Sequence, residues 1–356
     1  MEIGIIGLPQ SGKTTIFNAL TRGNQPIDVS AGKMTVHTAV IDVPDDRVDA
    51  LSNIFQPQKT IYAKVTYADI AGLGGVADKG EISGQLLNQL SQMDGFIHVV
   101  RCFESALVPH IHESVDPGRD IQLMDEEFIL NDQIMVERKL EKLSEEMKKG
   151  GGREKALVQR EIVLFEKLQA TLSEFIPLRD MEFTEEDHRS MSGFGFLSKK
   201  PIVILENISE DQDPLEITYV HQDSMVVSLM GKLEMDLAQL PDADAEIFMK
   251  EYGIETLGLN RMIQTSYDIL GLQSFFTVGE DEVRAWTVQR GALAPQAAGV
   301  IHTDMEKGFI RAEVIAYQDL IDAGSMPEAR SRGKLRLEGK QYAVMDGDII
   351  SIRFNN

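Results

Sequence analysis

The stretch Gly7-Leu8-Pro9-Gln10-Ser11-Gly12-Lys13-Thr14 decides the fold of this chain. It fits the P-loop pattern G-x-x-x-x-G-K-[ST], follows the apolar run Ile3 to Ile6, and precedes a plausible helix that begins at Thr15. Glycines let the backbone wrap so that its N–H groups point at phosphates, and the helix N-terminus adds partial positive charge. This stretch and Thr15 are therefore predicted to bind the phosphates of a purine nucleotide.

The P-loop implies a set of catalytic and metal-binding residues. Lys13 is expected to reach the β- and γ-phosphates, and the Thr14 hydroxyl to bind the Mg²⁺ ion that bridges them. Asp69 ends the strand-like run Val65 to Ala68 and opens a D-x-x-G pattern that closes at Gly72. Behind a P-loop, such an aspartate holds Mg²⁺ through water, and the Gly72 N–H can meet the γ-phosphate.

The residue that positions the attacking water is less obvious. Leu73 occupies the place where regulatory GTPases commonly carry a glutamine, and leucine has no hydrogen-bonding group. His110, in the loop after Arg101-Cys102-Phe103-Glu104, is a candidate substitute, because imidazole can orient water near neutral pH. A surface histidine with no role remains the alternative, since His112 lies two residues further on.

Base selection is predicted from the segment that follows the fifth strand. The N-K-x-D motif that selects guanine does not occur, and the chain reads Asn207-Ile208-Ser209-Glu210 at this point instead. Asn207 can still hold a purine ring nitrogen, but the altered acidic position, Glu210, removes the expected guanine lock. ATP is therefore at least as good a candidate as GTP, with an ordinary acidic turn as the alternative reading.

Strand-like and helix-like segments alternate in the first part of the chain, which predicts an α/β fold with a parallel sheet. Several strand candidates are continuous apolar runs, as strands covered on both faces should be. The candidates are Ile3 to Ile6, Val40 to Val43, Val65 to Ala68, Phe96 to Val100, Ile202 to Leu205 and Val226 to Leu229.

Between the fourth and fifth of these strands the periodicity becomes helical. Apolar residues recur at heptad spacing on both sides of Gly150-Gly151-Gly152, which permits a reversal of the chain. They are Ile129, Val136, Leu140, Leu143 and Met147 in the first arm, and Val158, Ile162, Phe165, Leu172 and Ile176 in the second. An inserted antiparallel coiled-coil hairpin is predicted, with an ordinary pair of packed helices as the alternative.

The chain beyond Leu270 is rich in short strand-like segments and predicts a small α+β domain. The candidates are Phe275 to Val278, Ala285 to Val288, Phe309 to Ile315, Leu335 to Leu337 and Ile349 to Phe354.

Composition limits the compartment and the partners. The chain has 356 residues, enough for two or three domains, with one cysteine, no basic leader and no apolar run of membrane-spanning length. A cytoplasmic protein without membrane insertion is expected. The formal net charge of −22 opposes broad adhesion to nucleic acid, so any RNA contact must be local. Candidate basic spots are Lys148, Lys149 and Arg153, then Lys199 and Lys200, then Arg330, Arg332, Lys334, Arg336 and Lys340.

With these motifs assembled, the chain resembles the YchF, or Obg-like ATPase, family along essentially its whole length. The P-loop, Val43-Pro44-Asp45-Asp46-Arg47, Asp69 to Leu73 and the segment Val99 to Glu104 carry the resemblance in the first part. The most specific match is carboxyl-terminal, where Ala294 to Asp304 and Glu306 to Val314 are similar to the ubiquitin-like TGS domain of the family.

The resemblance implies a discontinuous P-loop G domain over residues 1–127 and 196–273, a helical coiled-coil insertion over 128–195 and a TGS domain over 274–356. It also implies ATP preferred over GTP, slow hydrolysis, and association with ribosomes or translation factors. It makes His110 the match to the family's substitute for the missing glutamine, and it places Ile208 beside the base.

Several positions depart from the family pattern and indicate a divergent member. Gln10 and Ser11 stand where asparagine and valine are usual, and Met230 stands in the base-contacting loop where a small residue is usual. The first switch reads Asp28 to Val36, so that Thr35 is only a candidate second Mg²⁺ ligand. Two alternatives to an ATPase switch stay open: a GTPase of the same fold, and a nucleotide-dependent binding protein with negligible hydrolysis.

Overall fold

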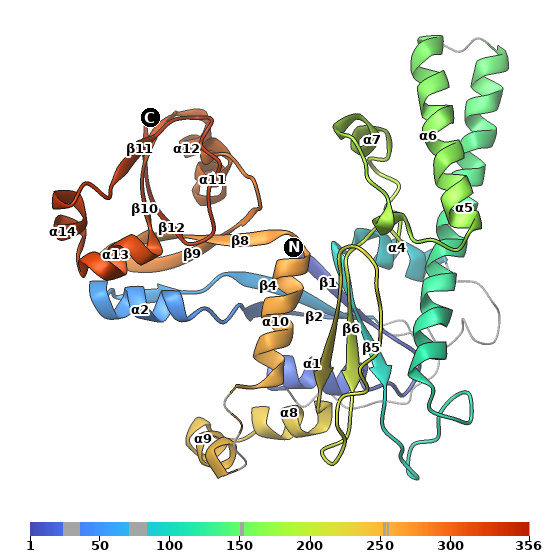
Figure 1. The fold of residues 1–356 in the computed structure, drawn as a ribbon, viewed down its shortest axis with the longest axis horizontal. Coiled ribbons are helices and arrows are strands. Elements are labelled where there is room, and N and C mark those ends of the chain that lie inside the picture. The colour runs from blue at the N-terminus through green and yellow to red at the C-terminus, as the bar shows by residue number, and fades with distance from the viewer. Residues whose placement is uncertain (24–35, 71–83, 150–152, 252–253, 255, 356) are drawn as a thin grey trace. The chain divides into compact units, whose positions relative to one another are not determined.

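The computed structural model describes residues 1–23, 36–70, 84–149, 153–251, 254 and 256–355 (Figure 1). The chain forms two compact units. The first joins Met1–Ala39 to Thr66–Met262, and the second joins Val40–Val65 to Ile263–Asn356. In the described part of the chain, no helix has the length and apolar character needed to span a membrane.

A six-stranded sheet in the order β2-β4-β1-β5-β6-β7 runs through the first unit. Neighbouring strands from β4 to β7 pair in parallel, and β1, β5 and β6 are buried along nearly their whole length, as a sheet covered on both faces requires. The α/β prediction and all six predicted strands are confirmed. The strands are β1 (Glu2–Ile6), β2 (Val36–Asp42), β4 (Lys64–Ile70), β5 (Gly95–Arg101), β6 (Ile202–Asn207) and β7 (Ser224–Leu229).

Helices cover this sheet. α1 (Lys13–Thr21) packs against α8 (Gly231–Ala238), and an apolar core joins the sheet to α4 (Gly84–Gln92) and to the start of α5 (Pro117–Lys149). In that core the rings of Phe96 and Phe128 lie 5.1 Å apart. The other helical segments are η2 (Leu178–Asp180), α7 (Glu185–Ser190), α9 (Asp242–Glu251) and α10 (Gly258–Ile269).

The predicted hairpin is formed by α5 and α6 (Lys155–Ser173), which lie side by side in Figure 1. Val136, Leu143 and Phe165 are fully or almost fully buried in the seam, so the heptad prediction is confirmed. Its last position is wrong: α6 ends at Ser173, because Phe175 turns the backbone to φ 56°, and Ile176 is 42% exposed.

The second unit is built on a mixed sheet in the order β11-β10-β12-β8-β9-β3. Apolar residues of β8, β10, β12 and α11 form its core, which confirms the α+β prediction. Its strands are β3 (Lys59–Ile61), β8 (Leu272–Val278), β9 (Glu282–Gln289), β10 (Phe309–Ala316), β11 (Arg336–Glu338) and β12 (Asp348–Phe354). Its helices are α2 (Asp46–Phe55), α11 (Ala294–Ile301), α12 (Thr303–Lys307), α13 (Tyr317–Ala323) and α14 (Met326–Ser331).

One part of the second unit comes from the amino-terminal part of the chain. Strand β3 pairs in parallel with β9, and Arg47 of α2 forms an ion pair with Asp346 and stacks 5.1 Å from the centre of the Phe276 ring. The compact units thus group Val40–Val65 with the carboxyl-terminal strands, whereas the expected domain boundaries placed it in the G domain. Those boundaries remain a prediction.

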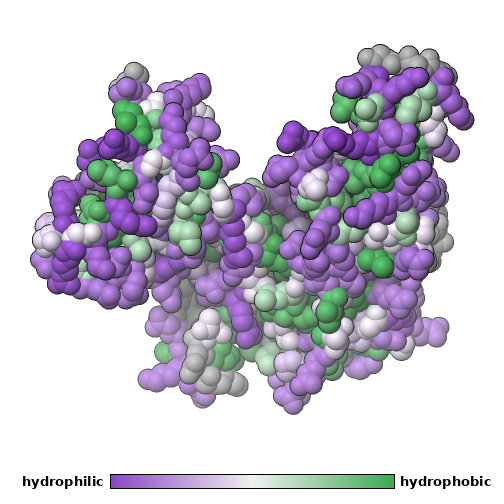
Figure 2. Space-filling model, turned by 45° about the horizontal axis from the view of Figure 1, so that its top comes forward, coloured by the Kyte–Doolittle hydropathy of each residue, from purple (hydrophilic) through white to green (hydrophobic). Residues whose placement is uncertain are grey.

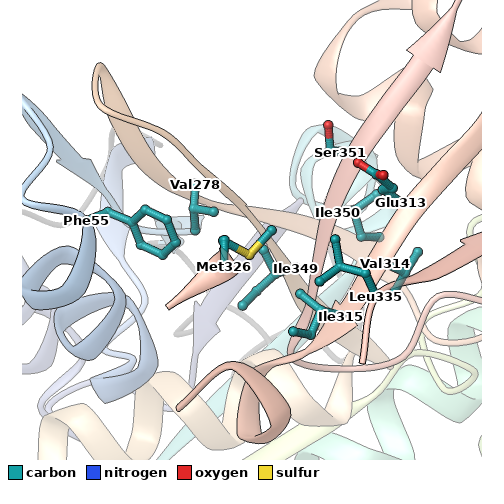
Figure 3. A pocket seen from close by; sticks show the side chains of 10 residues that line it. All are labelled: Phe55, Val278, Glu313, Val314, Ile315, Met326, Leu335, Ile349, Ile350 and Ser351. Atoms are coloured by element: carbon teal, nitrogen blue, oxygen red, sulfur yellow. The ribbon is translucent and has the colours of Figure 1, made fainter. Parts of the chain in front are cut away.

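The second unit also contains a cavity of about 180 Å³. Figure 3 shows it lined mainly by apolar side chains, with the oxygens of Glu313 and Ser351 near one another at one end. On the face drawn in Figure 2, hydrophilic residues predominate and hydrophobic residues form smaller patches between them, in keeping with the charge of the chain.

Candidate nucleotide-binding site

The P-loop follows β1 and depends on backbone angles that only glycine adopts readily. Gly7 has φ +146° and Gly12 has φ +104°. A Cβ at Gly7 would lie 2.4 Å from the carbonyl oxygen of Val99, and a Cβ at Gly12 would lie 2.1 Å from Nδ2 of Asn207. The loop is therefore packed tightly against β5 and β6, and α1 begins directly after it with its N-terminus free to face an anion.

Lys13 lies at the end of this loop, and its Nζ donates hydrogen bonds to the carbonyl oxygens of Gly7 (2.9 Å) and Leu8 (2.8 Å). Burial lowers the pKa of Lys13 to about 8, while the charge of Asp69 opposes that shift. Burial and the charge of Lys13 lower the pKa of the nearby His98 to about 3, so His98 is neutral at pH 7. An incoming phosphate would give the partly desolvated ammonium group the anionic partner that carbonyls do not provide.

Thr14 and Asp69 come together although they belong to different motifs. The Thr14 hydroxyl donates to Oδ2 of Asp69 at 3.2 Å. Burial raises the pKa of Asp69, and the Lys13 charge and the Thr14 hydrogen bond oppose the rise. The structure thus brings together Lys13, Thr14 and Asp69, three of the predicted catalytic residues.

The donor set fits Mg²⁺. A hydroxyl and a carboxylate are the oxygen ligands that Mg²⁺ takes when it is held mainly by substrate phosphates and water. No cluster of three or more His, Cys, Asp or Glu side chains suited to a metal occurs among the described residues. In addition, Oγ of Ser11 is buried inside the P-loop with no hydrogen-bond partner in the described part of the chain.

Asn207 braces the P-loop. Its Nδ2 donates to the carbonyl oxygen of Ser11 at 2.9 Å, and its Oδ1 accepts from the N–H of Gly231 at 3.2 Å, where α8 begins. The side chain is buried, and its amide is engaged at both ends. The predicted contact between Asn207 and a purine ring nitrogen remains a prediction, because the structure shows the amide bonded to the loops on either side.

The other predicted base-contacting residues, Ile208, Met230 and Glu210, differ in their exposure to solvent. Ile208 is buried, and its N–H donates to the carbonyl oxygen of Leu229 at 3.0 Å. Met230 is half-buried at the start of α8, while Glu210 is exposed. The nearby acidic residue that is buried is Glu206, which accepts hydrogen bonds from the Ser228 hydroxyl and the Ile217 N–H. Glu206 and Glu210 lie four residues apart in the same segment, and the sequence alone does not indicate which of the two is buried.

His110 is held inside its own loop. Its Nε2 lies 3.0 Å from Oδ2 of Asp120, and its Nδ1 accepts from the N–H of His112 at 3.1 Å, so Nε2 carries the proton. The guanidinium group of Arg119 donates two hydrogen bonds to Oδ1 of the same Asp120. Both imidazole nitrogens are therefore engaged, and His110 would have to leave this arrangement to orient a water molecule.

Three of the predicted functional positions, Thr35, Gly72 and Leu73, lie outside the described residues. Asp120 and Arg101, which contact the loop that carries His110, were not predicted from the sequence. Asp120 is the fourth residue of α5. Only its short distance along the chain from His110 could have suggested that the two side chains are in contact.

Known proteins resemble this chain along its whole length. The family model YchF-GTPase_C, described as a protein of unknown function, matches residues 272–355, and a model described as a 50S ribosome-binding GTPase matches residues 2–142. The ribosome-binding ATPase YchF of Bacillus subtilis is 38% identical, over 100% of this chain and 99% of the relative. Its namesake in Haemophilus ducreyi is 39% identical, over 99% of each chain.

A solved structure extends the likeness to the whole fold. The YchF GTPase of Schizosaccharomyces pombe superposes with a TM-score of 0.82 at 28% sequence identity, covering 99% of this chain and 97% of that one. The similarity therefore includes both compact units and the helical hairpin.

Proposed function

The chain belongs to the YchF family, and from this membership we propose that it is an ATP-dependent molecular switch that binds ribosomes or a translation factor. Nucleoside triphosphatase activity agrees with the names of its relatives and with its P-loop domain. The observation that carries the proposal is the 3.2 Å hydrogen bond between Thr14 and Asp69 beside the half-buried Lys13, because it joins the two motifs that a magnesium nucleotide requires.

In the proposed mechanism, the P-loop N–H groups and Lys13 bind the β- and γ-phosphates. Thr14 and Asp69 would hold Mg²⁺, with Thr35 as a candidate second ligand, and the ion would neutralise charge that develops on the transferred phosphoryl group. The hydrogen bond to Asp69 would orient the Thr14 hydroxyl, and Asn207 would hold the P-loop against the start of α8.

We propose ATP as the preferred nucleotide. Glu210, which replaces the guanine-selecting aspartate, is exposed, and Asn207 is engaged with the P-loop, so the described residues offer no acidic side chain fixed for guanine. A GTPase is the second candidate, because the S. pombe structure and the amino-terminal family model both carry that name.

Turnover is proposed to be slow. Leucine at position 73 cannot orient water, and His110 is bonded at both nitrogens in this structure. His110 is proposed to act after its loop rearranges. If it does not, the chain would be a nucleotide-dependent binding protein with negligible hydrolysis.

Partner binding in the cytoplasm is proposed to depend on protein contacts and local RNA contacts. Five of the basic residues picked from the sequence form ion pairs with carboxylates, namely Arg153 with Glu146 and Glu161, Arg330 with Glu313, Arg332 with Glu328, Lys334 with Asp319, and Arg336 with Glu338 and Asp348. Lys200 donates to three backbone carbonyl oxygens near the end of α4. Broad, non-specific attachment to RNA is therefore not favoured.

Co-sedimentation with purified ribosomes tests the switch. Protein loaded with a non-hydrolysable ATP analogue should sediment differently from protein loaded with ADP, and Lys13→Ala should remove that difference. Lys64→Ala is the control, because Lys64 is an exposed lysine that forms an ion pair with Asp42 at the opposite end of β4 from Asp69. Equal sedimentation of the wild-type protein in both nucleotide states would contradict the proposal.

A further inference from the structure

Arg101 is the largest fully buried side chain of the chain as described, and the mechanism above does not use it. It is the last residue of β5, and its guanidinium group lies 4.7 Å from the centre of the Phe103 ring. Its Nε donates to the carbonyl oxygen of Phe103 at 3.0 Å, and its Nη2 donates to the carbonyl oxygen of Val108 at 2.7 Å. One arginine thus holds two points of the loop that leads to His110.

This arginine is costly to bury. Within the described residues Arg101 forms no ion pair, and its Nη1 is buried without a hydrogen-bond partner. Burial lowers the pKa of Arg101, and the charges of Glu104 and Asp120 only partly oppose this shift. A desolvated charge bonded only to neutral carbonyls is unfavourable unless its geometry is required. The planar guanidinium group donates to the carbonyl oxygens of Phe103 and Val108 at the same time, whereas a lysine would place a single ammonium group there.

The loop that Arg101 holds starts at the nucleotide site. Arg101 is the register neighbour of Asn207 on the adjacent strand β6, and the N–H of Cys102 donates to the carbonyl oxygen of Asn207 at 3.0 Å. Asn207 in turn bonds the P-loop through Ser11. A continuous set of hydrogen bonds therefore connects the P-loop with the first residues of the loop.

At its far end the loop is fixed at His110. The N–H groups of His112, Glu113 and Ser114 each donate to an acceptor on His110 or His112, and Asp120 holds the imidazole from α5. Between these contacts and Asn207, the guanidinium group of Arg101 is the buried side chain that spans the loop.

We propose that Arg101 is a positioning residue for ATP hydrolysis, which holds the loop 103–112 so that His110 starts from one defined place, the one in which it contacts Asp120. This inference rests on the proposed function, in which His110 acts on the attacking water. Arg101 acts through His110, so its loss slows turnover while nucleotide binding by the P-loop is kept.

Arg101→Lys and Arg101→Gln test the proposal. Lysine keeps the positive charge but cannot donate to both carbonyl oxygens as the planar guanidinium group does. Glutamine keeps a hydrogen-bond donor and removes the cost of a buried charge, so at least one variant should fold. Arg179→Lys is the matched control, because Arg179 is also a buried arginine but bonds Asp125, Tyr219 and the Ser198 carbonyl oxygen at the base of the hairpin.

Two readouts are measured on each variant. Amide hydrogen exchange at His112, Glu113 and Ser114 should become at least about tenfold faster in the Arg101 variants, because two charge-assisted hydrogen bonds are lost. The kcat for ATP should fall by about tenfold or more with the Kd for ATP unchanged. The control should change neither the exchange at these amides nor kcat.

A double-variant cycle with His110→Ala separates positioning from a merely structural role. If Arg101 acts through His110, the double variant Arg101→Lys/His110→Ala turns over no more slowly than His110→Ala alone. Additive losses, or an unchanged kcat in a variant whose loop amides exchange faster, would overturn the inference. Absence of ATP turnover in the wild-type protein would instead count against the proposed function.

Discussion

The hydroxyl of Thr14 donates a hydrogen bond of 3.2 Å to the carboxylate of Asp69, which lies on the strand next to β1 in the sheet. Ile5 and Asp69 are register neighbours on the adjacent strands β1 and β4, so the sheet itself delivers the two groups to the same edge. The pairing of the strands thus brings together the two residues that are proposed to hold Mg²⁺.

Removing either member of this pair should weaken nucleotide binding only when Mg²⁺ is present. Thr14→Ala and Asp69→Asn are each expected to weaken magnesium-dependent ATP binding by about 10- to 100-fold. Binding measured in EDTA should change much less. Thr21→Ala is the control, because its hydroxyl donates only within α1, to Phe17 and Asn18. Equal weakening with and without Mg²⁺ would show that the pair does not hold the ion.

Asn207→Ala distinguishes a brace from a base-reading residue. The substitution leaves the Ser11 carbonyl and the Gly231 N–H without their partner and should lower the free energy of unfolding by about 1 to 3 kcal/mol. If Asn207 acts as a brace, ATP and GTP affinities should fall by the same factor in competition titrations. A change in the ratio of the two affinities would show that Asn207 also contacts the base.

Nucleotide binding should depend on pH through Lys13. Burial lowers the pKa of Lys13 to about 8, so the free protein loses this positive charge as the pH rises through that value. Bound phosphate favours the charged form and raises the pKa, so binding takes up a proton above pH 8 and ATP affinity falls as the pH increases. Calorimetry at pH 8.5 in buffers of different ionisation enthalpy measures this uptake.

Lys13→Arg is the matching variant for that titration, since arginine stays charged across the range. Its affinity is expected to be lower but nearly independent of pH between about 7.5 and 9.5. Proton release on binding, or the same pH dependence in Lys13→Arg, would rule out Lys13 as the titrating group.

Asp132 should anchor the base of the hairpin. Its buried carboxylate accepts hydrogen bonds from the N–H groups of Leu197 and Ser198 and from the Ser198 hydroxyl. Asp132→Ala leaves these donors unsatisfied and should reduce the free energy of unfolding by about 2 to 4 kcal/mol. Glu141→Ala, at an exposed position of the same helix, should change it by less than about 0.5 kcal/mol.

Asp132 should also make the free energy of unfolding depend on pH. Burial raises the pKa of Asp132 from 3.8 to about 6, so between these values the folded protein binds more protons at this site than the unfolded chain. Its contribution to stability therefore falls as the pH rises from about 4 to about 6. That part of the pH dependence should disappear in Asp132→Ala, as denaturation at several pH values would show.

The sequence predicted the features that are local. The P-loop and Asp69 are short motifs next to apolar strands, and the continuous burial of β1, β5 and β6 matches their uninterrupted apolar runs. The hairpin was predictable for the same reason, since the apolar positions of a heptad repeat are the ones that become buried between the two helices.

Features that depend on distant pairing were not predictable. Strand β3 is only three residues long and acquires its strand character by pairing with β9, so neither its composition nor its periodicity marks it. The bracing role of Asn207 and the contact between His110 and Asp120 likewise arise only when separate elements meet.

The most direct test of the central claim is a calorimetric titration of nucleotide-free protein with ATP and GTP in Mg²⁺ buffer, followed by phosphate release with the preferred nucleotide. We expect tighter binding of ATP than of GTP, slow phosphate release, and loss of that release in Lys13→Ala. Tighter binding of GTP, or phosphate release that survives in Lys13→Ala, would contradict it.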